Sequence, residues 1–241
     1  MPIARRARFS AKTHTGLVRA VNEDAVLALP EQGIWIVSDG MGGYKGGAFA
    51  SQTVVDAVAM QPPDASGVVD AAAVADAVMS AHTIIQAEAD RAQATMGATV
   101  VALILSEDRY QCLWSGDSRL YLLRQGDLQM ISTDHSVVAD LVKAGEMDWD
   151  EADQSAMSNQ ITQAVGVGEH PGLEHVAGPL EPGDRFLLCS DGLTKYANRK
   201  TLLHVMAHAS IEHVVERLLE IAMEGGADDN ITLVVVEIPR A

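Results

Sequence analysis

The stretch I34-W-I-V-S-D-G-M-G-G43 places a short apolar run directly before an aspartate and a glycine. The run I-W-I-V is typical of a buried strand, and the Asp-Gly dipeptide marks the loop where such a strand ends. The same pattern returns at F186-L-L-C-S-D-G192. Two apolar strands that each lead into a Ser-Asp-Gly turn predict a sheet with carboxylates along one edge.

Outside these two stretches, strands come in runs, and helices are grouped between and after them. Alanine-rich segments with apolar residues at helical spacing predict helices, and apolar runs bounded by turn residues predict strands. We expect helices over 47–60, 68–91, 134–146, 149–156, 201–209 and 211–224, with a loop over 61–67. We expect strands over 34–38, 98–105, 110–115, 119–124, 186–190 and 231–238, with an antiparallel meander through the turns at 115–118 and 124–127. This grouping favours an α+β fold of antiparallel sheets covered by helices, in one domain over 1–241.

Composition is that of an ordinary globular protein. The 241 residues are 48% hydrophobic and 21% charged, which allows one domain with a sizeable core. No apolar segment is long enough to cross a membrane, and no apolar stretch follows the basic N-terminus as it would in a secretory signal. The two cysteines, Cys112 and Cys189, lie inside apolar runs. We interpret them as buried thiols in a reducing compartment and predict a cytoplasmic protein.

The formal charge is −16, from 33 acidic and 17 basic residues. Such a field repels nucleic acid and anionic membranes, so neither is expected as a partner. A phosphorylated substrate would be repelled as well unless cations stood at the binding site. By composition alone, a merely acidic surface is the favoured explanation of the excess.

Several acidic groups occupy positions where a strand ends or a tight turn begins. Clustered carboxylates repel one another, and a divalent cation removes that penalty. Hard oxygen ligands suit Mg²⁺ or Mn²⁺. Each turn taken singly is also an ordinary Asp-Gly or Gly-Asp dipeptide, which leaves a purely structural role open. The groups are Asn22-Glu23-Asp24, Ser38-Asp39-Gly40, Gly116-Asp117-Ser118, Ser190-Asp191-Gly192 and Asp228-Asp229-Asn230.

Seven motifs, in order, resemble the metal-dependent protein phosphatase family (the PPM, or type 2C, phosphatases), particularly its compact bacterial members. The resemblance covers residues 16 to 232, nearly the whole chain. It implies two stacked antiparallel sheets flanked by helices, an α-β-β-α sandwich, and hydrolysis of phosphoserine and phosphothreonine by a two-metal-activated water. The motifs are G16-L-V-R-A-V-N-E-D24, V37-S-D-G-M-G-G43, M96-G-A-T99, G116-D-S-R119, S132-T-D-H-S136, L188-C-S-D-G-L193 and D228-D-N-I-T232.

The resemblance also implies the core of a metal site. By position, Asp39 would bridge two Mn²⁺ or Mg²⁺ ions, with the Gly40 carbonyl on one of them. Asp191 and Asp229 would complete the shell of the other ion. Neither cysteine fits a phosphatase nucleophile, because no C-x₅-R pattern surrounds them.

Four further residues are given supporting roles by the same resemblance. Glu23 would reach a metal through water, and Asp24 would support it from behind. Asp117, with Asp191, would form a third and weaker site. Arg19 matches the family's phosphate-binding arginine, whose planar guanidinium can grip two phosphate oxygens at once.

Two features depart from or vary within the family pattern. Met41 stands where some members have a histidine that is a candidate general acid, and methionine cannot donate a proton. His135 is the alternative donor, although a buried structural role is favoured. Residues 137–160 correspond to the variable flap beside the active site. Trp149 either packs against the body or helps the flap to select peptide sequences.

Three other functions compete with that of a protein phosphatase. A nucleotide-binding loop fails because position 45 is Lys where G-x-G-x-x-G requires Gly. A non-catalytic phosphoprotein-binding module is disfavoured by the intact aspartates, while a phosphatase for small molecules stays open. The family resemblance implies phosphorylated protein substrates and a bacterial Ser/Thr kinase as counterpart. Nothing in the sequence indicates an obligate oligomer, so a monomer is expected.

Overall fold

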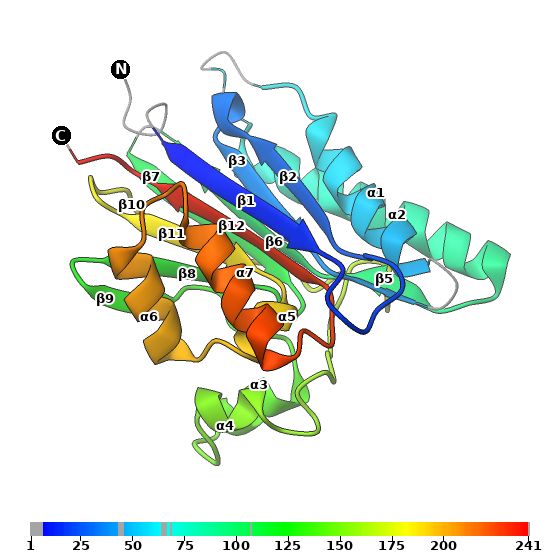
Figure 1. Ribbon diagram of the computed structural model, residues 1–241. Helices are drawn as coiled ribbons and strands as arrows, with labels where there is room; N and C mark the ends of the chain where they lie inside the picture. Colours follow the sequence, from blue (N-terminus) through cyan, green and yellow to red (C-terminus); the bar gives the residue numbers. More distant parts are fainter. Residues whose placement is uncertain (1–6, 43–45, 64–66, 68, 107, 241) are drawn as a thin grey trace.

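The computed structural model describes residues 7–42, 46–63, 67, 69–106 and 108–240. The described residues form two five-stranded antiparallel sheets, a two-stranded ribbon and flanking helices (Figure 1). The sheets pack face to face, and helices cover the outer side of each. The predicted α+β sandwich is therefore confirmed, while the assignment of 1–241 to one domain stays a prediction.

The first sheet has the order β1-β12-β11-β8-β9, and the second has the order β10-β7-β6-β3-β2. The strands of the first are β1 (Arg8–His14), β12 (Ile231–Glu237), β11 (Arg185–Cys189), β8 (Arg119–Arg124) and β9 (Asp127–Met130). Those of the second are β10 (Glu174–Pro179), β7 (Arg109–Ser115), β6 (Val100–Leu105), β3 (Ile34–Ser38) and β2 (Ala25–Leu29). The ribbon pairs β4 (Gly40–Gly42) with β5 (Met96–Ala98).

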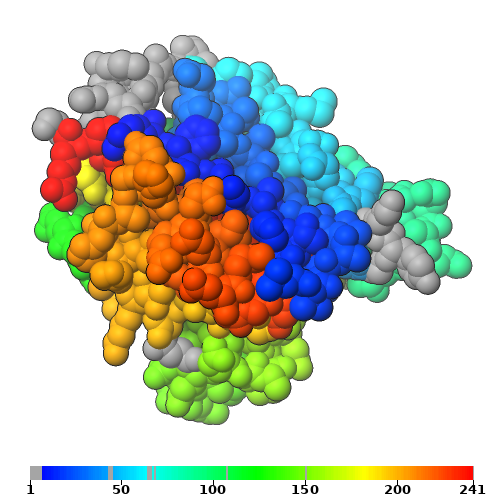
Figure 2. All heavy atoms as spheres, viewed as in Figure 1, coloured from blue at the N-terminus to red at the C-terminus, as the bar shows by residue number. Residues whose placement is uncertain are grey.

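Helices α1 (Gly46–Ala59) and α2 (Ala71–Ala92) cover the second sheet, and a 3₁₀ turn, Pro30–Gln32, joins β2 to β3. Helices α5 (Asp191–Thr194), α6 (Arg199–His208) and α7 (Val214–Gly225) cover the first. The short helices α3 (Val137–Lys143) and α4 (Trp149–Asp153) belong to the flap, which forms a projecting green lobe in Figure 2. None of the described helices has the length and apolar character that a membrane crossing requires.

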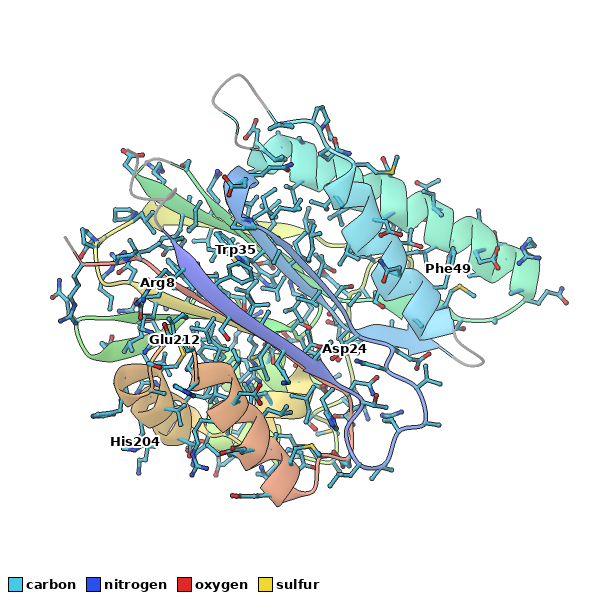
Figure 3. The ribbon with its side chains drawn as sticks, turned by 45° about the horizontal axis from the view of Figure 1, so that its top comes forward. Arg8, Asp24, Trp35, Phe49, His204 and Glu212 are labelled. Carbon is cyan, nitrogen blue, oxygen red and sulfur yellow. The ribbon has the colours of Figure 1, made fainter. Side chains whose placement is uncertain are left out.

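Strand alternation explains why the apolar runs are continuous. Along β3, Trp35 and Val37 enter the core between the sheets, whereas Ile34 and Ile36 pack under α1 and α2. Successive side chains of a strand point to opposite faces, so a strand buried on both sides needs apolar residues at every position. Figure 3 shows Trp35 inside the sandwich, and its relative exposure is 0%.

Two expectations about strands need correction. The strand predicted over 98–105 is divided at Thr99 into β5 and β6. The predicted meander is confirmed only for β8 and β9, which pair across Arg124↔Asp127. The turn at 115–118 carries the chain from one sheet to the other, because β7 pairs with β6 while β8 pairs with β11. Turn residues mark a reversal but do not specify whether the next strand joins the same sheet.

The other predicted elements agree with the structure to within a few residues at most ends, although α3 and α4 are shorter than expected. Part of the predicted loop over 61–67 lies outside the described residues. The strands β1, β2 and β10 were not expected. Each is a partly exposed strand at a sheet edge, with a mixed polar and apolar pattern. Such strands have a weaker apolar signal than fully buried ones.

We predict that Phe186→Ala lowers the free energy of unfolding by about 3–5 kcal/mol, because it leaves a cavity between the sheets. The Phe186 ring is fully buried and lies 5.2 Å from the Tyr110 ring, centroid to centroid. Urea denaturation would measure the loss. Phe49→Ala is the control, since Phe49 is 40% exposed on α1 (Figure 3) and should cost well under half as much. Equal losses would contradict this account of the core.

Candidate active site

The strand register brings the predicted carboxylates to one edge of the sandwich. Ala25 at the start of β2 pairs with Ser38 at the end of β3. In the first sheet, the ends of β1 and β11 meet the start of β12, as the pairs His14↔Ile231 and Cys189↔Leu233 show. The loops that carry the acidic motifs leave or enter the strands at these points. Asp24 is labelled at this edge in Figure 3.

A cleft of about 250 Å³ opens at this edge. It brings together every predicted metal or phosphate ligand except Asp24, from motifs as far apart as residues 19 and 229. Its lining consists of Arg19, Glu23, Asp39, Gly40, Met41, Gly42, Thr99, Asp117, Asn159, Ile161, Asp191, Asp229 and Asn230. Asp24 lies behind the cleft, where its Oδ2 accepts a hydrogen bond of 2.9 Å from Ser190 Oγ. This position is compatible with the supporting role of Asp24, which stays a prediction.

Thr99 fixes the loop that carries Asp39. Its Oγ1 accepts a hydrogen bond of 2.9 Å from the Asp39 backbone N–H, and its own N–H donates to the Asp39 carbonyl at 2.8 Å. Ser38 Oγ donates to the Thr99 carbonyl at 2.6 Å. These bonds tie the end of β3 to the point where β5 and β6 separate. The break at Thr99 is therefore part of how the site is built.

Gly40 is required by close backbone packing. A Cβ at this position would lie 2.1 Å from the Gly47 carbonyl oxygen and 2.5 Å from that of Glu23. Both distances are far below van der Waals contact, and neither neighbour is a movable side chain. Glycine thus lets three backbone segments meet beside Asp39.

Burial and mutual repulsion disfavour the ionised forms of the carboxylates. Burial, reinforced by the neighbouring aspartates, raises the pKa of Asp39 and of Asp117 well above the usual range. The same causes raise the pKa of Asp24 to about 7 and that of Asp191 to about 6. Within the part of the chain that the structure describes, Asp24 Oδ1 and Asp191 Oδ1 are buried without a hydrogen-bond partner. Buried, unpartnered carboxylate oxygens fit the needs of a hard divalent cation.

The carboxylates alone do not complete a metal shell. Among residues 7–42, 46–63, 67, 69–106 and 108–240, no group of three or more His, Cys, Asp or Glu side chains is arranged to hold an ion. Mg²⁺ commonly takes one or two protein carboxylates and keeps several waters. The donor set of this cleft fits that mode, with the Gly40 carbonyl as a further oxygen ligand. The individual ligand roles stay predictions.

Arg19 supplies the positive charge at the mouth of the cleft. Its Nη2 donates a hydrogen bond of 2.8 Å to Asp229 Oδ2, and half of its side chain is exposed. Burial alone lowers the pKa of Arg19, but attraction to Asp229, Asp191 and Asp39 outweighs it and raises the pKa. The guanidinium is thus held beside the carboxylates with part of its surface free.

Met41, which replaces a candidate proton donor, and His135, the alternative donor, are placed differently. Met41 lines the cleft. His135 is buried behind the Asp117 loop, where its Nδ1 accepts from the Gly116 N–H at 3.1 Å and its Nε2 lies 3.1 Å from Glu174 Oε1. Both ring nitrogens are engaged, and His135 is not among the residues that line the cleft. This supports the structural interpretation of His135.

The cysteines are confirmed as buried free thiols. Burial raises the pKa of Cys189 to about 12 and shifts that of Cys112 still further upward. The thiolate is the reactive form of cysteine. Neither residue can therefore act as a nucleophile near neutral pH.

Sequence reasoning missed the roles of Thr99, Asn159, Ile161 and Asn230. Asn230 braces the loop before β2: its Oδ1 accepts from the Glu23 N–H at 2.7 Å, and its Nδ2 donates to the carbonyls of Thr15 and Val21. Thr99 and Asn230 belong to quoted motifs, so their placement carried a signal that was not used. Asn159 and Ile161 reach the cleft only through the fold of the flap.

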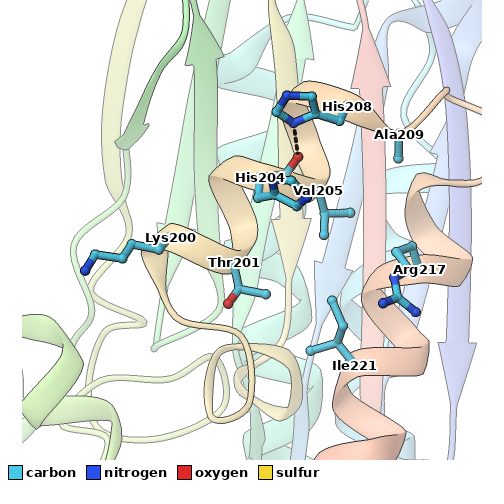
Figure 4. Close-up of a pocket in the computed structure, with 8 residues that line it drawn as sticks. All are labelled: Lys200, Thr201, His204, Val205, His208, Ala209, Arg217 and Ile221. Atoms are coloured by element: carbon cyan, nitrogen blue, oxygen red, sulfur yellow. Dashed lines mark hydrogen bonds between the residues drawn. The ribbon is translucent and has the colours of Figure 1, made fainter.

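A larger hollow lies elsewhere, in a groove of about 550 Å³ between α6 and α7 (Figure 4). His204 and His208 line it with Lys200 and Arg217, and His208 Nδ1 donates to the His204 carbonyl at 2.8 Å. The groove has no carboxylate in its lining. We therefore assign the chemistry to the smaller, carboxylate-lined cleft.

Similarity to known proteins supports the assignment of this cleft as the active site. The sequence profile described as protein phosphatase 2C matches residues 18–229. The chain belongs to the protein phosphatase 2C family. The profile spans the residues that line the cleft from Arg19 to Asp229.

Bacterial serine/threonine phosphatases are among the relatives. PstP of Mycobacterium tuberculosis is 36% identical over 234 residues, which are 96% of this chain and 45% of PstP. This chain thus spans less than half of that protein. The serine/threonine phosphatase stp of Listeria monocytogenes is 28% identical over 236 residues, covering 94% of each chain.

Solved structures share the fold closely. PppA, described as a key regulatory component of T6SS in Pseudomonas aeruginosa, has a TM-score of 0.87 and 39% identity, covering 96% of this chain and 97% of its own. The catalytic domain of PstP in complex with two manganese ions has a TM-score of 0.86 and 33% identity, covering 97% and 98%. A two-metal site is therefore present in a protein of this fold.

We predict that in chelator the protein loses stability as the pH rises from about 4 to about 7. Raised pKa values mean that the folded state binds more protons than the unfolded state in this window, so deprotonation costs stability. Mn²⁺ should reduce the loss by neutralising the ionised carboxylates. Thermal melts between pH 5 and 7.5 would measure both effects.

Asp39→Asn is the matched control, because it removes one partly buried charge with little change of shape. Its melting temperature in chelator should fall less steeply with pH than that of the wild type. Identical pH profiles for the two proteins would contradict the proposed carboxylate repulsion.

Proposed function

We propose that this chain is a metal-dependent phosphatase that hydrolyses phosphoserine and phosphothreonine in proteins. The observation that carries the proposal is the cleft in which buried Asp117 and the partly buried Asp39 and Asp191 face the half-exposed Arg19. Negative side chains alone would exclude a phosphate. Carboxylates that hold cations, with an arginine at the rim, instead form a site for one.

Divalent cations are the proposed cofactors, as Mn²⁺ or Mg²⁺, two per chain and a third if Asp117 takes part. Asp39, the Gly40 carbonyl, Asp191 and Asp229 would hold the first two, and Glu23 would act through water. When bound, such ions supply an activated water for attack on phosphorus and neutralise charge on the phosphoryl oxygens. The buried oxygens without partners support this assignment.

The protein's own residues would bind and orient the substrate. Arg19 can turn from Asp229 toward a phosphoryl group, because it is held by an ion pair at the surface and only partly buried. Thr99 and Ser38 keep Asp39 in place. The hydrogen bond from Ser190 Oγ holds the Asp24 carboxylate behind the cleft.

The leaving serine or threonine oxygen needs a proton. No histidine lines the cleft within the part of the chain that the structure describes, and Met41 cannot donate one. We propose that water in the cleft supplies this proton. Because Met41 occupies the position of a histidine found in some family members, we expect a lower rate of hydrolysis but not a loss of activity.

The proposed substrates are phosphorylated proteins, and the proposed counterpart is a Ser/Thr kinase whose products the enzyme would reset. Relatives named as serine/threonine phosphatases support this choice. The charge of −16 argues against nucleic acid and anionic membranes. A cytoplasmic location and a monomeric state stay predictions.

We predict that activity on a phosphothreonine peptide requires Mn²⁺ or Mg²⁺, is abolished by chelator and returns on adding metal. Asp39→Asn should lower kcat by at least about 10²-fold, because it would remove a carboxylate proposed to hold the ions that neutralise the developing charge. Initial rates with the peptide and with p-nitrophenyl phosphate would measure this. Activity that survives chelation or the substitution would refute the mechanism.

The same assay separates the rivals left open by the sequence. Hydrolysis of the aryl phosphate but not of the peptide would indicate a phosphatase for small molecules. Binding of the peptide without hydrolysis of either compound would indicate a phosphoprotein-binding module.

We predict that Arg19→Ala lowers kcat/KM by about tenfold or more, because charge-assisted hydrogen bonds to phosphate contribute about 1.5–3 kcal/mol. Arg19→Lys should recover only part of the loss, since lysine cannot grip two oxygens in a plane. Steady-state kinetics on the peptide would test this. Full activity of the alanine variant would exclude Arg19 as a phosphate ligand.

A further inference from the structure

Arg119 is buried at the base of the flap, with a relative exposure of 5%. Its Nε and Nη2 donate to Asp134 at 2.9 and 2.7 Å. Its Nη2 and Nη1 donate to Asp153 at 2.6 and 3.2 Å, and Nη1 also donates to the Tyr121 hydroxyl at 3.2 Å. A guanidinium has five N–H donors. All five are therefore used.

Two of the partners come from one face of a flap helix. Trp149 and Asp153 are four residues apart on α4, so they lie on the same side of it. The Trp149 ring lies over the guanidinium, 4.9 Å from its carbon, while Asp153 binds its edge. Ala152, between them, is fully buried. The short helix α4 thus contacts the sheet through Arg119 of β8.

The rest of the flap is held at its base. Val138 and Ala139 of α3 are buried, and the Val137 N–H donates to the Gln160 carbonyl at 3.0 Å. Near α4, another side-chain hydrogen bond to the body runs from Gln154 Nε2 to the Lys195 carbonyl at 3.1 Å, and it is exposed. Arg119 is therefore the principal buried attachment of the α4 end.

The attached segment leads directly to the catalytic cleft. After α4 the chain continues to Asn159 and Ile161, which form part of the cleft wall. A small cavity lies between the two regions, and Asp117, Arg119, Asp153 and Asn159 all line it. Arg119, which holds α4, thus follows Asp117 by two residues in the sequence. It lines the same small cavity as Asn159 of the cleft wall.

We propose that Arg119, Asp153 and Trp149 form a clamp that fixes the flap as a wall of the catalytic cleft. The three act as positioning residues, through Asn159 and Ile161, and do not contact the substrate. Trp149 is then held on Arg119 and is not displayed for peptide contact. The proposal rests on the proposed function, because it concerns the placement of substrates in that cleft.

The chemistry of the clamp is specific to arginine. A guanidinium can bind two carboxylates edge-on while an indole stacks on its face, whereas an ammonium cannot do both. Removing one partner leaves a buried charge incompletely paired, which favours release of the flap segment that carried the partner. Loss of Asp153 or Trp149 should therefore free α4 and leave the sandwich intact.

The test compares Asp153→Ala and Trp149→Ala with Glu146→Ala, which removes an exposed flap carboxylate outside the clamp. Hydrogen exchange of the amides over 147–158 should be at least tenfold faster in the two clamp variants. It should be unchanged in the control, and the melting temperatures should stay close to that of the wild type. Trp149→Phe should restore most of the protection, because an aromatic face is retained.

Kinetics provide the second readout. The clamp variants should lose at least fivefold in kcat/KM on a phosphothreonine peptide and less than twofold on p-nitrophenyl phosphate, because the aryl phosphate has no peptide chain for the flap wall to position. Arg119→Lys should resemble them if it folds. Should it not fold, the two flap variants decide the matter.

Several outcomes would overturn the clamp. The first is unchanged amide hydrogen exchange over 147–158, and the second is faster exchange with no loss of kcat/KM on the peptide. The third is an equal loss of kcat/KM on both substrates, which would place the effect at Asp117. If the wild type hydrolyses neither compound, the proposed function has failed. The exchange measurement then still decides whether the clamp holds the flap.

Discussion

The mutual repulsion of buried and partly buried carboxylates at one edge of the sandwich is the constraint around which this molecule is organised. Burial and proximity raise the pKa values of Asp24, Asp39, Asp117 and Asp191, so the folded chain holds these groups at a cost when they are ionised. Bound divalent cations offset that cost. The feature that destabilises the site without metal is thus the feature that prepares it for metal and phosphate.

The sandwich tolerates this edge because its strands are held from both sides. Strands β3, β11 and β12 are buried between the opposite sheet and a helix layer, which fixes the positions where they end. Short bonds such as those between Thr99 and Asp39 then transmit the rigidity of the core to the ligands. The active-site loops are consequently held by the core instead of by their own packing.

Arg119 represents a different use of buried charge. Asp39 and its neighbours are short of positive partners, whereas Arg119 has all its donors satisfied by Asp134, Asp153 and Tyr121. One cluster is arranged to receive ions and the other to hold protein segments together. The two meet around Asp117, so the metal edge and the flap share a boundary.

The sequence by itself determined the sandwich and which carboxylates gather in the cleft, because apolar runs ending in Ser-Asp-Gly are local signals and the ordered motifs identify a family. It did not determine that β7 and β8 lie in different sheets, that β1, β2 and β10 exist, or that Asn159 reaches the cleft. Those features depend on contacts between residues far apart in the sequence, and turn and periodicity patterns carry no information about such contacts. Trp149 is the clearest case: two roles fitted its sequence context, and only its position over Arg119 favours one of them, because a stacking contact across 30 residues has no local signature.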